Sequence, residues 1–223
     1  MNVTLIVPTR NEEGCIGKVL KEIPRKYVDE VLIVDGNSTD KTVLEAKKFM
    51  KKGSDRLVIQ KGKGYGGAFI EGIKLAKGDV IVMMDADGSH NPADIPFLIN
   101  KLKEGYDYAM SSRYMTGGRS FDDTLIRWCG NQLFTKLTNM VHNMHITDSL
   151  YLLTAVRKKD LLKLNLKQTG FEFCTEIIVK ASSAGLRFAE TPAIERARYN
   201  GVSKVSAFFD GLKILKSIFM KYK

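Results

Sequence analysis

Residues 80–90 read VIVMMDADGSH, an apolar run that ends in an Asp-Ala-Asp triplet. A short continuous apolar run bounded by turn formers indicates a strand buried on both faces, as in a parallel sheet. Two more apolar runs, residues 3–7 and 31–34, are followed by the polar stretches PTRNEE and DGNSTD. Ligands bind at the carboxyl ends of parallel strands, so we expect the functional site among these polar residues.

Helical patterns alternate with the apolar runs in the first half of the chain. They span residues 12–23, 39–50 and 67–76, and a further short strand is expected at 57–59. Ser38 and Asp40 are the candidate caps of the second helix. This alternation of strand and helix predicts a mostly parallel α/β sheet covered by helices.

The second half of the chain is less regular. We expect strands at residues 106–111 and 150–156, and helices at 123–144, 171–184 and 203–221. The sequence contains no repeat and no linker rich in Pro or Ser, so we predict a single domain over residues 1–223.

Composition narrows the classes of function. The net charge of +10, from 35 basic and 25 acidic residues, indicates anionic partners: nucleic acid, anionic lipid or phosphate-bearing substrates. Nucleic acid is the weakest of these, because the basic residues are spread along the chain and aromatic stacking motifs are absent. Three scattered cysteines, no leader-like N-terminus and no apolar run of transmembrane length predict a cytoplasmic protein with reduced thiols.

The carboxylates after the strands indicate a cation. Asp85 and Asp87 repel each other after a buried strand unless a positive partner offsets them. Mg²⁺ or Mn²⁺ suits their hard oxygen atoms and bridges a diphosphate, while Asp35 is placed to accept bonds from a base or ribose. A single Asp at a strand end is often only a turn former, which is the interpretation we prefer for Asp40.

Residues 62–67, GKGYGG, match the dinucleotide fingerprint G-x-G-x-x-G, with an acidic pair about 20 residues later. The motif follows the third strand of the unit, whereas the fingerprint follows the first. An alternative is a loop that closes on a donor diphosphate, with Lys63 as a cation. A nucleotidyltransferase or an NAD(P)-dependent enzyme is the competing enzyme class.

Five motifs in order resemble glycosyltransferase family 2, and within it the dolichyl-phosphate mannosyltransferase type. They are PTRNE at 8–12, VDGNSTD at 34–40, GKG at 62–64, DAD at 85–87, and SRY at 112–114 with Gly117-Gly118. The resemblance runs nearly end to end. It implies the GT-A fold and inverting transfer of a hexose from GDP-mannose or a UDP-hexose, with Mg²⁺ or Mn²⁺, to a polyprenyl phosphate.

The resemblance also implies roles for individual residues. The positions at which the family binds base and ribose are Pro8, Arg10, Glu12 and Asp35. The metal motif corresponds to Asp85 and Asp87, with Ser89 where relatives often have Gln. Arginines near the phosphates correspond to Arg113 and Arg127, and a basic loop near the reaction centre to Arg198 and Lys204. The stretch 148–151, DSLY, departs from the Ser-Gly-Phe-Arg run of close relatives.

The acceptor decides whether a general base is needed. A phosphate monoester has a second pKa near ~6 and is already an anionic nucleophile, so cations suffice to hold it. Arg127, Arg198 and Lys204 fit that role. A saccharide acceptor, the alternative, needs a base, for which Glu172 and Glu176 are the candidates. For Glu176 we prefer the interpretation of an ordinary helix carboxylate.

Two helical segments predict contact with a membrane surface at its cytoplasmic face. In the C-terminal segment one face carries the apolar residues Val205, Phe208, Phe209, Leu212, Leu215 and Phe219, with lysines flanking it. The 125–144 segment carries Trp128 beside Arg127. An apolar face with a basic rim can lie in a bilayer interface, or it can pack on the domain. The sequence leaves open whether a partner subunit supplies a membrane anchor.

Overall fold

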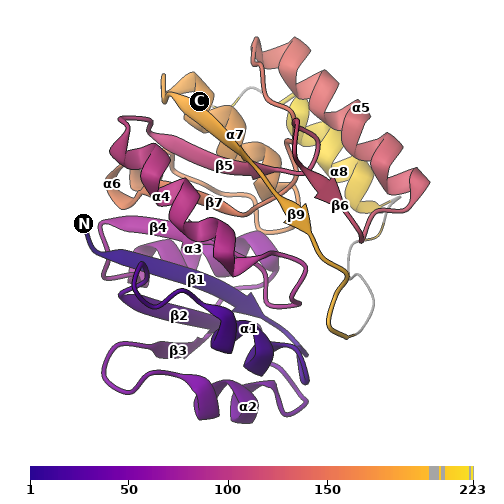
Figure 1. Ribbon diagram of the computed structural model, residues 1–223. Coiled ribbons are helices and arrows are strands. Elements are labelled where there is room, and N and C mark those ends of the chain that lie inside the picture. The colour runs from indigo at the N-terminus through magenta and orange to yellow at the C-terminus, as the bar shows by residue number, and fades with distance from the viewer. Residues whose placement is uncertain (201–205, 207–208, 221, 223) are drawn as a thin grey trace.

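A seven-stranded sheet, in the order β3-β2-β1-β4-β7-β5-β8, forms the centre of the molecule (Figure 1). The computed structural model describes residues 1–200, 206, 209–220 and 222. The strands are β1 (Val3–Thr9), β2 (Glu30–Asp35), β3 (Arg56–Ile59), β4 (Val80–Met83), β5 (Tyr108–Ser112), β7 (Thr154–Arg157) and β8 (Phe188–Pro192). All neighbours pair in parallel except β7, which is antiparallel to β4 and β5. The predicted mostly parallel sheet is therefore confirmed.

Helices cover both faces of the sheet. One face packs against α1 (Ile16–Glu22), α2 (Thr42–Phe49) and α4 (Ile95–Lys103), the last entered through the 3₁₀ turn η1 (Pro92–Asp94). The other packs against α3 (Tyr65–Leu75), α6 (Lys158–Lys163) and α7 (Phe173–Ser183). The alternation of a strand explains the two cores: Leu5 and Val7 belong to the first, and Ile6 to the second.

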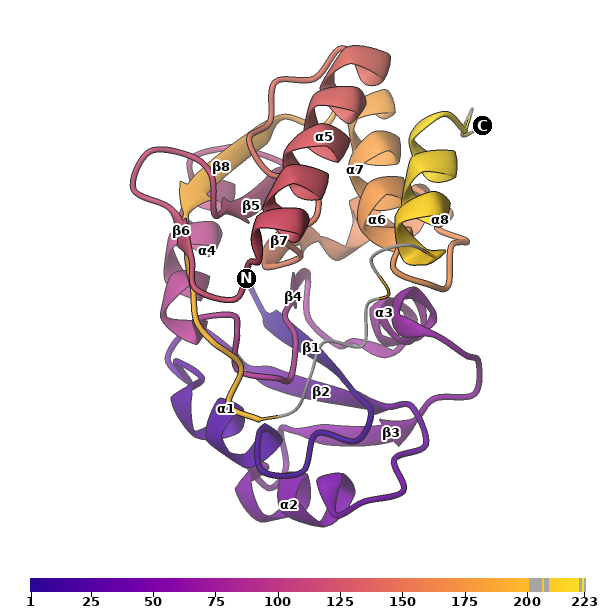
Figure 2. The same ribbon diagram turned by 90° about the vertical axis from the view of Figure 1, so that its right-hand side faces the viewer.

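A further helical layer lies outside α7. It consists of α5 (Leu125–His142) and α8 (Phe209–Ile218), which run side by side (Figures 1 and 2). A small parallel ribbon of β6 (Arg119–Ser120) and β9 (Ile194–Glu195) leads into this layer. Thr124 caps α5, because its hydroxyl accepts a hydrogen bond from the Arg127 amide.

The predicted second helix begins at Thr42 rather than 39, and three other predicted boundaries also need correction. The first helix begins at Ile16 rather than 12, because Asn11 and Gly14 adopt positive φ and residues 12–15 form a turn. The predicted strand 150–156 is assigned only from Thr154, although the Leu153 carbonyl already accepts a hydrogen bond from the Ser111 amide at 2.9 Å. The last helix is described over Phe209–Ile218, and residues 203–205, 207–208 and 221 of its predicted range lie outside the described residues.

The register of the sheet positions the predicted site. Thr9 pairs with Asp35 across β1 and β2, and Ile6 pairs with Met83 across β1 and β4. Parallel pairing therefore brings the ends of β1, β2 and β4 to one edge of the sheet, with Asp85 just beyond. This confirms the prediction that the polar stretches after these three strands share one edge of the sheet.

Candidate functional site

Asp87 is held by the turn that follows β4. Its side chain is mostly buried, and its Oδ1 accepts hydrogen bonds from the Ser89 amide at 2.9 Å and the Ser89 hydroxyl at 2.7 Å. Its Oδ2 contacts the Arg198 guanidinium. Burial acts to raise the pKa of Asp87, but the charge of Arg198 and the bonds from Ser89 outweigh it and leave this pKa lowered. Asp87 is therefore a carboxylate at neutral pH.

Asp85 is more exposed and is oriented by aromatic neighbours. The Tyr65 hydroxyl donates to Asp85 Oδ1 at 2.7 Å. His90 accepts a hydrogen bond from the Asp85 amide at Nδ1, while its Nε2 lies 3.7 Å from Asp85 Oδ2. Burial lowers the pKa of His90 to about 4, so the ring is neutral at pH 7 and its hydrogen is on Nε2. Tyr65 and His90 thus fix both the side chain and the backbone of Asp85.

The residues predicted to bind base and ribose lie at the ends of β1 and β2. Asp35 is buried and anchors its turn, accepting bonds from Thr9 Oγ1, the Ser38 amide and the Ser38 hydroxyl. Arg10 is exposed beside it, and Pro8 and Glu12 are half-buried. Asp40 accepts from the Thr42 amide at the start of α2, as expected of a turn former.

The glycine-rich loop owes its glycines to close packing. Gly64 has φ of 82°, and a Cβ at Gly66 would lie 2.5 Å from the Gln168 carbonyl oxygen. The Gly67 amide donates to the Thr169 carbonyl at 3.1 Å. The loop thus packs against the 168–170 segment that leads into α7, and the Lys63 side chain is exposed.

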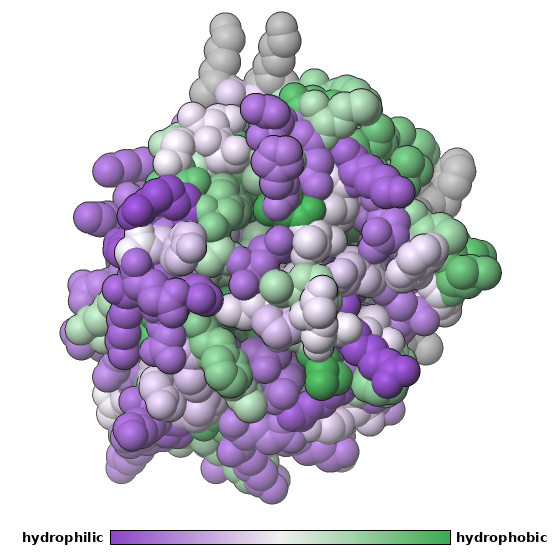
Figure 3. Space-filling model, turned by 45° about the horizontal axis from the view of Figure 1, so that its top comes forward, coloured by the Kyte–Doolittle hydropathy of each residue, from purple (hydrophilic) through white to green (hydrophobic). Residues whose placement is uncertain are grey.

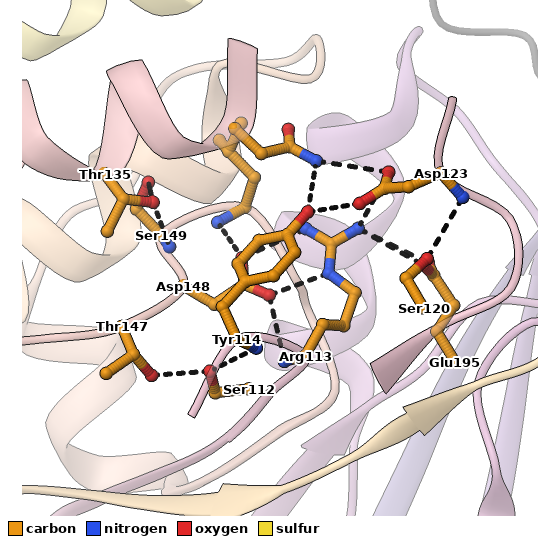
Figure 4. A network of polar contacts seen from close by, with 12 residues as sticks. Ser112, Arg113, Tyr114, Ser120, Asp123, Thr135, Thr147, Asp148, Ser149 and Glu195 are labelled. Carbon is orange, nitrogen blue, oxygen red and sulfur yellow. Dashed lines mark hydrogen bonds and ion pairs between the residues drawn. The ribbon is translucent and has the colours of Figure 1, made fainter. Parts of the chain in front are cut away.

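Arg113 is buried in a network of carboxylates (Figure 4). Its Nε and Nη2 donate to Asp148 at 2.7 and 3.0 Å, a bidentate pair, and its Nη1 lies 3.4 Å from Glu195 and 3.8 Å from Asp123. Burial acts to lower the pKa of Arg113, but the charge of Asp148, its hydrogen bonds and the charge of Glu195 together outweigh burial and leave this pKa raised. The network joins the end of β5 to the segment before β7, to β9 and to the start of α5. The structure therefore gives Arg113 a clear structural role.

Two of the other predicted cations meet at one aspartate. Arg198 Nε donates to Asp122 Oδ2 at 3.1 Å, and Arg127 Nη1 lies 3.6 Å from the same oxygen. Lys204 lies outside the described residues. Of the base candidates, Glu176 is buried, accepts from the amides of residues 167 and 168 and pairs with Lys180 at 2.8 Å. This matches the ordinary structural carboxylate that we expected.

A cavity of about 290 Å³ lies beside Asp85, between the sheet and the α5/α8 layer. Polar groups line part of it: Asp85, Ser89, His90, Arg113, Asp122, Asp123, Arg127, Asn131, Glu195 and Arg198. Apolar side chains line the rest: Ile126, Phe134, Leu150, Leu152, Phe171 and Ile214. Strand order places β4 between the β1/β2 edge and this cavity. The site therefore has two halves that share the Asp85–Asp87 motif.

The family follows from sequence comparison. The model of glycosyl transferase family 2 matches residues 4–164 of the chain. The chain belongs to glycosyltransferase family 2. It is thus a glycosyltransferase, which confirms the family and the enzyme class predicted from the motifs.

Relatives of this glycosyltransferase cover most of its length. An uncharacterised protein of Methanocaldococcus jannaschii is 31% identical over 98% of this chain and 91% of that protein. The dolichol-phosphate mannosyltransferase of Pyrococcus furiosus is 32% identical over 92% of this chain, which spans 59% of that protein. The crystal structure of glucosyl-3-phosphoglycerate synthase from Mycobacterium tuberculosis, with Mn²⁺, UDP and glucosyl-3-phosphoglycerate, has a TM-score of 0.76 at 20% identity. That likeness covers 97% of this chain and 78% of the other, and it shows the fold.

Sequence reasoning missed several residues of the glycosyltransferase site. The sequence indicates Tyr65 only as part of the glycine motif and Asp123 only as the start of a predicted helix, and it assigns no role to Asp122. The sequence carries no signal that Asp148 and Glu195 pair with Arg113, which lies 35 and 82 positions away. The acidic pair Asp122-Asp123 just before α5, whose first turn contains Arg127, is a local sequence signal for part of this cluster.

Proposed function

We propose that this glycosyltransferase transfers a hexose, with inversion, from a nucleotide-sugar to a polyprenyl phosphate. The observation that carries the proposal is the cavity, because Asp85, Arg127 and Arg198 line it together with apolar side chains of α5 and α8. A polyprenyl phosphate combines an anionic head with an apolar chain. The relative from P. furiosus, by its name, uses dolichol phosphate, which supports this acceptor.

Asp85 and Asp87 fit Mg²⁺ or Mn²⁺ by the chemistry of their oxygens. Among the described residues no group of three or more His, Cys, Asp or Glu side chains is placed to hold a metal. Such ions are commonly held by one or two carboxylates together with substrate phosphates, so two carboxylates suffice. The bound ion would neutralise charge on the leaving diphosphate. Ser89, which is hydrogen-bonded to Asp87, is the proposed third protein ligand of the metal ion.

The donor half of the site follows from its position. We assign base and ribose recognition to Pro8, Arg10, Glu12 and Asp35, and diphosphate contact to Lys63. The parallel register of β1, β2 and β4 supports the assignment, since it places these residues next to Asp85 at one edge.

The acceptor half favours an anionic nucleophile. Three carboxylates that line the cavity are already engaged: Asp122 with Arg198, Asp123 with the Tyr114 hydroxyl, and Glu195 with the Ser120 hydroxyl. A saccharide hydroxyl needs a carboxylate that can take its proton. A phosphate needs only cations, and we assign Arg127, Arg198 and Lys204 to hold it and the transition-state charge, with Arg113 supporting them from the buried network.

The test is transfer of labelled hexose from GDP-mannose and from UDP-glucose, with Mg²⁺ or Mn²⁺, to three acceptors. These are a polyprenyl phosphate, 3-phosphoglycerate and a simple saccharide. The proposal predicts an organic-soluble, acid-labile product with the first acceptor. Label that enters only the water-soluble products would refute the polyprenyl phosphate acceptor, and turnover of 3-phosphoglycerate would identify a soluble phosphate acceptor instead.

We further propose that the α5/α8 layer rests on the cytoplasmic face of a membrane, where such an acceptor is found. No helix within the described ranges is long and apolar enough to cross a bilayer. Helix α8 packs on the domain through Ile214 and Ile218, which are buried. The α5/α8 layer exposes an apolar ridge made of Leu125, Ile126, Trp128, Leu133, Met140, Phe209, Leu212 and Phe219. Green side chains gather at the upper right of Figure 3, the side on which α5 and α8 lie in Figure 1.

Large exposed apolar patches mark interaction surfaces, and Trp128 suits a bilayer interface. Lys136, Lys213 and Lys216, all exposed, would add attraction of about 1 kcal/mol each to an anionic surface. The sequence-predicted residues Val205 and Phe208 lie outside the described residues.

Sedimentation with anionic and neutral liposomes tests the ridge. We expect binding that is stronger to anionic vesicles, weaker at high salt and partly salt-resistant. Trp128→Ser with Phe209→Ser should remove the salt-resistant part without lowering the melting temperature. Phe97→Ser, at an exposed phenylalanine on α4, is the matched control. Liposome binding that is unchanged by the double substitution would refute the assigned face, and no binding to any vesicle would favour a partner-supplied anchor.

A further inference from the structure

Both carboxylate oxygens of Asp87 already have protein partners. Oδ1 accepts the two bonds from Ser89, and Oδ2 contacts the Arg198 guanidinium. Asp87 is only 7% exposed, so little water competes for these oxygens. A divalent cation that binds Asp87 must therefore compete with Arg198 for Oδ2.

Arg198 is also held from its other side. Its Nε donates to Asp122 Oδ2 at 3.1 Å, so the guanidinium lies between two carboxylates. Burial acts against the charged guanidinium, and two anionic neighbours offset that cost. If one carboxylate is taken by another cation, the other still holds the arginine at the cavity.

The backbone on both sides of Arg198 is hydrogen-bonded to the turn that carries Asp87. The Tyr199 amide donates to the Asp87 carbonyl at 3.0 Å, and the Arg196 amide donates to the Ser89 carbonyl at 2.8 Å. The Tyr199 ring covers Gly88 so closely that a Cβ there would clash with it. Arg198 therefore stays next to Asp87 whichever carboxylate its side chain binds, and only the guanidinium has to move.

We propose that Arg198 is an internal counter-ion of Asp87, which the donor's metal ion displaces, and that the released guanidinium remains on Asp122 and turns to the substrate phosphates. The proposal rests on the proposed function, because it takes Asp87 to be a metal ligand. Two cations cannot share one buried carboxylate oxygen without strong repulsion. Metal alone should therefore bind weakly. A nucleoside diphosphate offers new anionic partners to both cations, so metal and nucleotide should bind cooperatively.

The experiment measures Mn²⁺ affinity by the electron paramagnetic resonance signal of free Mn²⁺, with and without UDP or GDP. Arg198→Gln removes the competing cation, so its affinity for Mn²⁺ alone should rise roughly five- to tenfold. The coupling between Mn²⁺ and nucleotide should fall by a similar factor, within the range of ordinary allosteric couplings. Arg198→Lys, which keeps a cation, should stay closer to the wild type.

Two further variants test whether the metal ion displaces Arg198 from Asp87 or whether any nearby positive charge weakens Mn²⁺ binding. Arg196→Gln removes the same charge from the same segment, but Arg196 contacts Glu22 and Asn91 instead, and it should leave Mn²⁺ affinity within about twofold. Asp122→Asn removes the second holder of Arg198, so Arg198 should bind Asp87 more tightly and Mn²⁺ alone more weakly. In the Arg198→Gln background the same change should have a much smaller effect.

The outcomes distinguish the counter-ion role of Arg198 from the existence of the metal site itself. Equal Mn²⁺ affinity for the wild type and Arg198→Gln, with coupling intact in both, would overturn the counter-ion role and leave the metal site standing. Mn²⁺ that binds no variant, even with nucleotide, would overturn the metal site and the proposed function with it. Melting curves for every variant show that folded protein is being compared. If Arg198→Gln does not fold, the opposite shift expected for Asp122→Asn still tests the proposal.

Discussion

Replacing Arg113 by alanine tests whether the buried network is a structural requirement. The Asp148 side chain is fully buried and would lose both bonds of its bidentate pair, and Glu195 would lose its nearest cation. Removing one partner of a buried ion pair costs about 3–5 kcal/mol, because an uncompensated charge remains. For a chain of this size, each kcal/mol lowers the melting temperature by roughly 2–4 °C. We therefore expect a fall of roughly 6–20 °C.

The assay is thermal unfolding followed by circular dichroism, with Arg119→Ala as the control. Arg119 is exposed on the neighbouring strand β6, so its removal should cost less than about 1 kcal/mol. Arg113→Lys keeps the charge but loses the bidentate geometry and should fall between the two. An Arg113→Ala protein that melts within about 2 °C of the wild type, yet has lost transfer activity, would refute the structural role and favour direct contact with the phosphates.

Three other substitutions give distinct readouts. Arg127→Ala should lower kcat/KM for the acceptor strongly while nucleotide affinity, measured by calorimetry, stays within about threefold; the reverse pattern would assign Arg127 to the donor. Gly66→Ala forces a Cβ against the Gln168 carbonyl and should cost several kcal/mol in a denaturant titration, whereas Gly62→Ala, in open space, should not. Burial raises the pKa of Asp94 to about 6, so the folded state holds a proton that the unfolded state loses above pH ~4, and stability falls as pH rises through that window. Asp94→Asn should therefore stabilise the protein by about 2–3 kcal/mol more at pH 7.5 than at pH 4, and a pH-independent difference in melting would contradict this.

The strand ends could be predicted from sequence because the information there is local. A buried apolar run followed by polar residues marks both the strand and its carboxyl end, as β4 and Asp85 show. The helix α4 was missed, since Pro92 and Pro96 look like helix breakers. In the structure Pro92 begins the 3₁₀ turn and Pro96 lies in the first turn of α4, where a missing amide hydrogen costs nothing.

The sequence indicated Arg127 and Arg198, but the contacts around the cavity could not be predicted, because they join residues far apart in the chain. Arg198 meets Asp87 across 111 positions and Arg113 meets Glu195 across 82. A sequence pattern shows the charge of each residue but not its partner. The same limit applies to β8, a five-residue strand that contains Glu190 and Pro192 and joins the sheet by pairing with β5.

The role of Asp87 is tested most directly by nucleotide binding with and without Mn²⁺. Calorimetric titration of the wild type with UDP and GDP should show affinity for at least one of them that Mn²⁺ increases about tenfold or more, equivalent to about 1.4 kcal/mol. In Asp87→Asn the Mn²⁺ effect should disappear, with transfer lost and the folded state retained in melting curves. An Asp87→Asn protein that keeps the full Mn²⁺ effect on nucleotide affinity would contradict the assignment of the strand-end aspartates to the metal-bound donor.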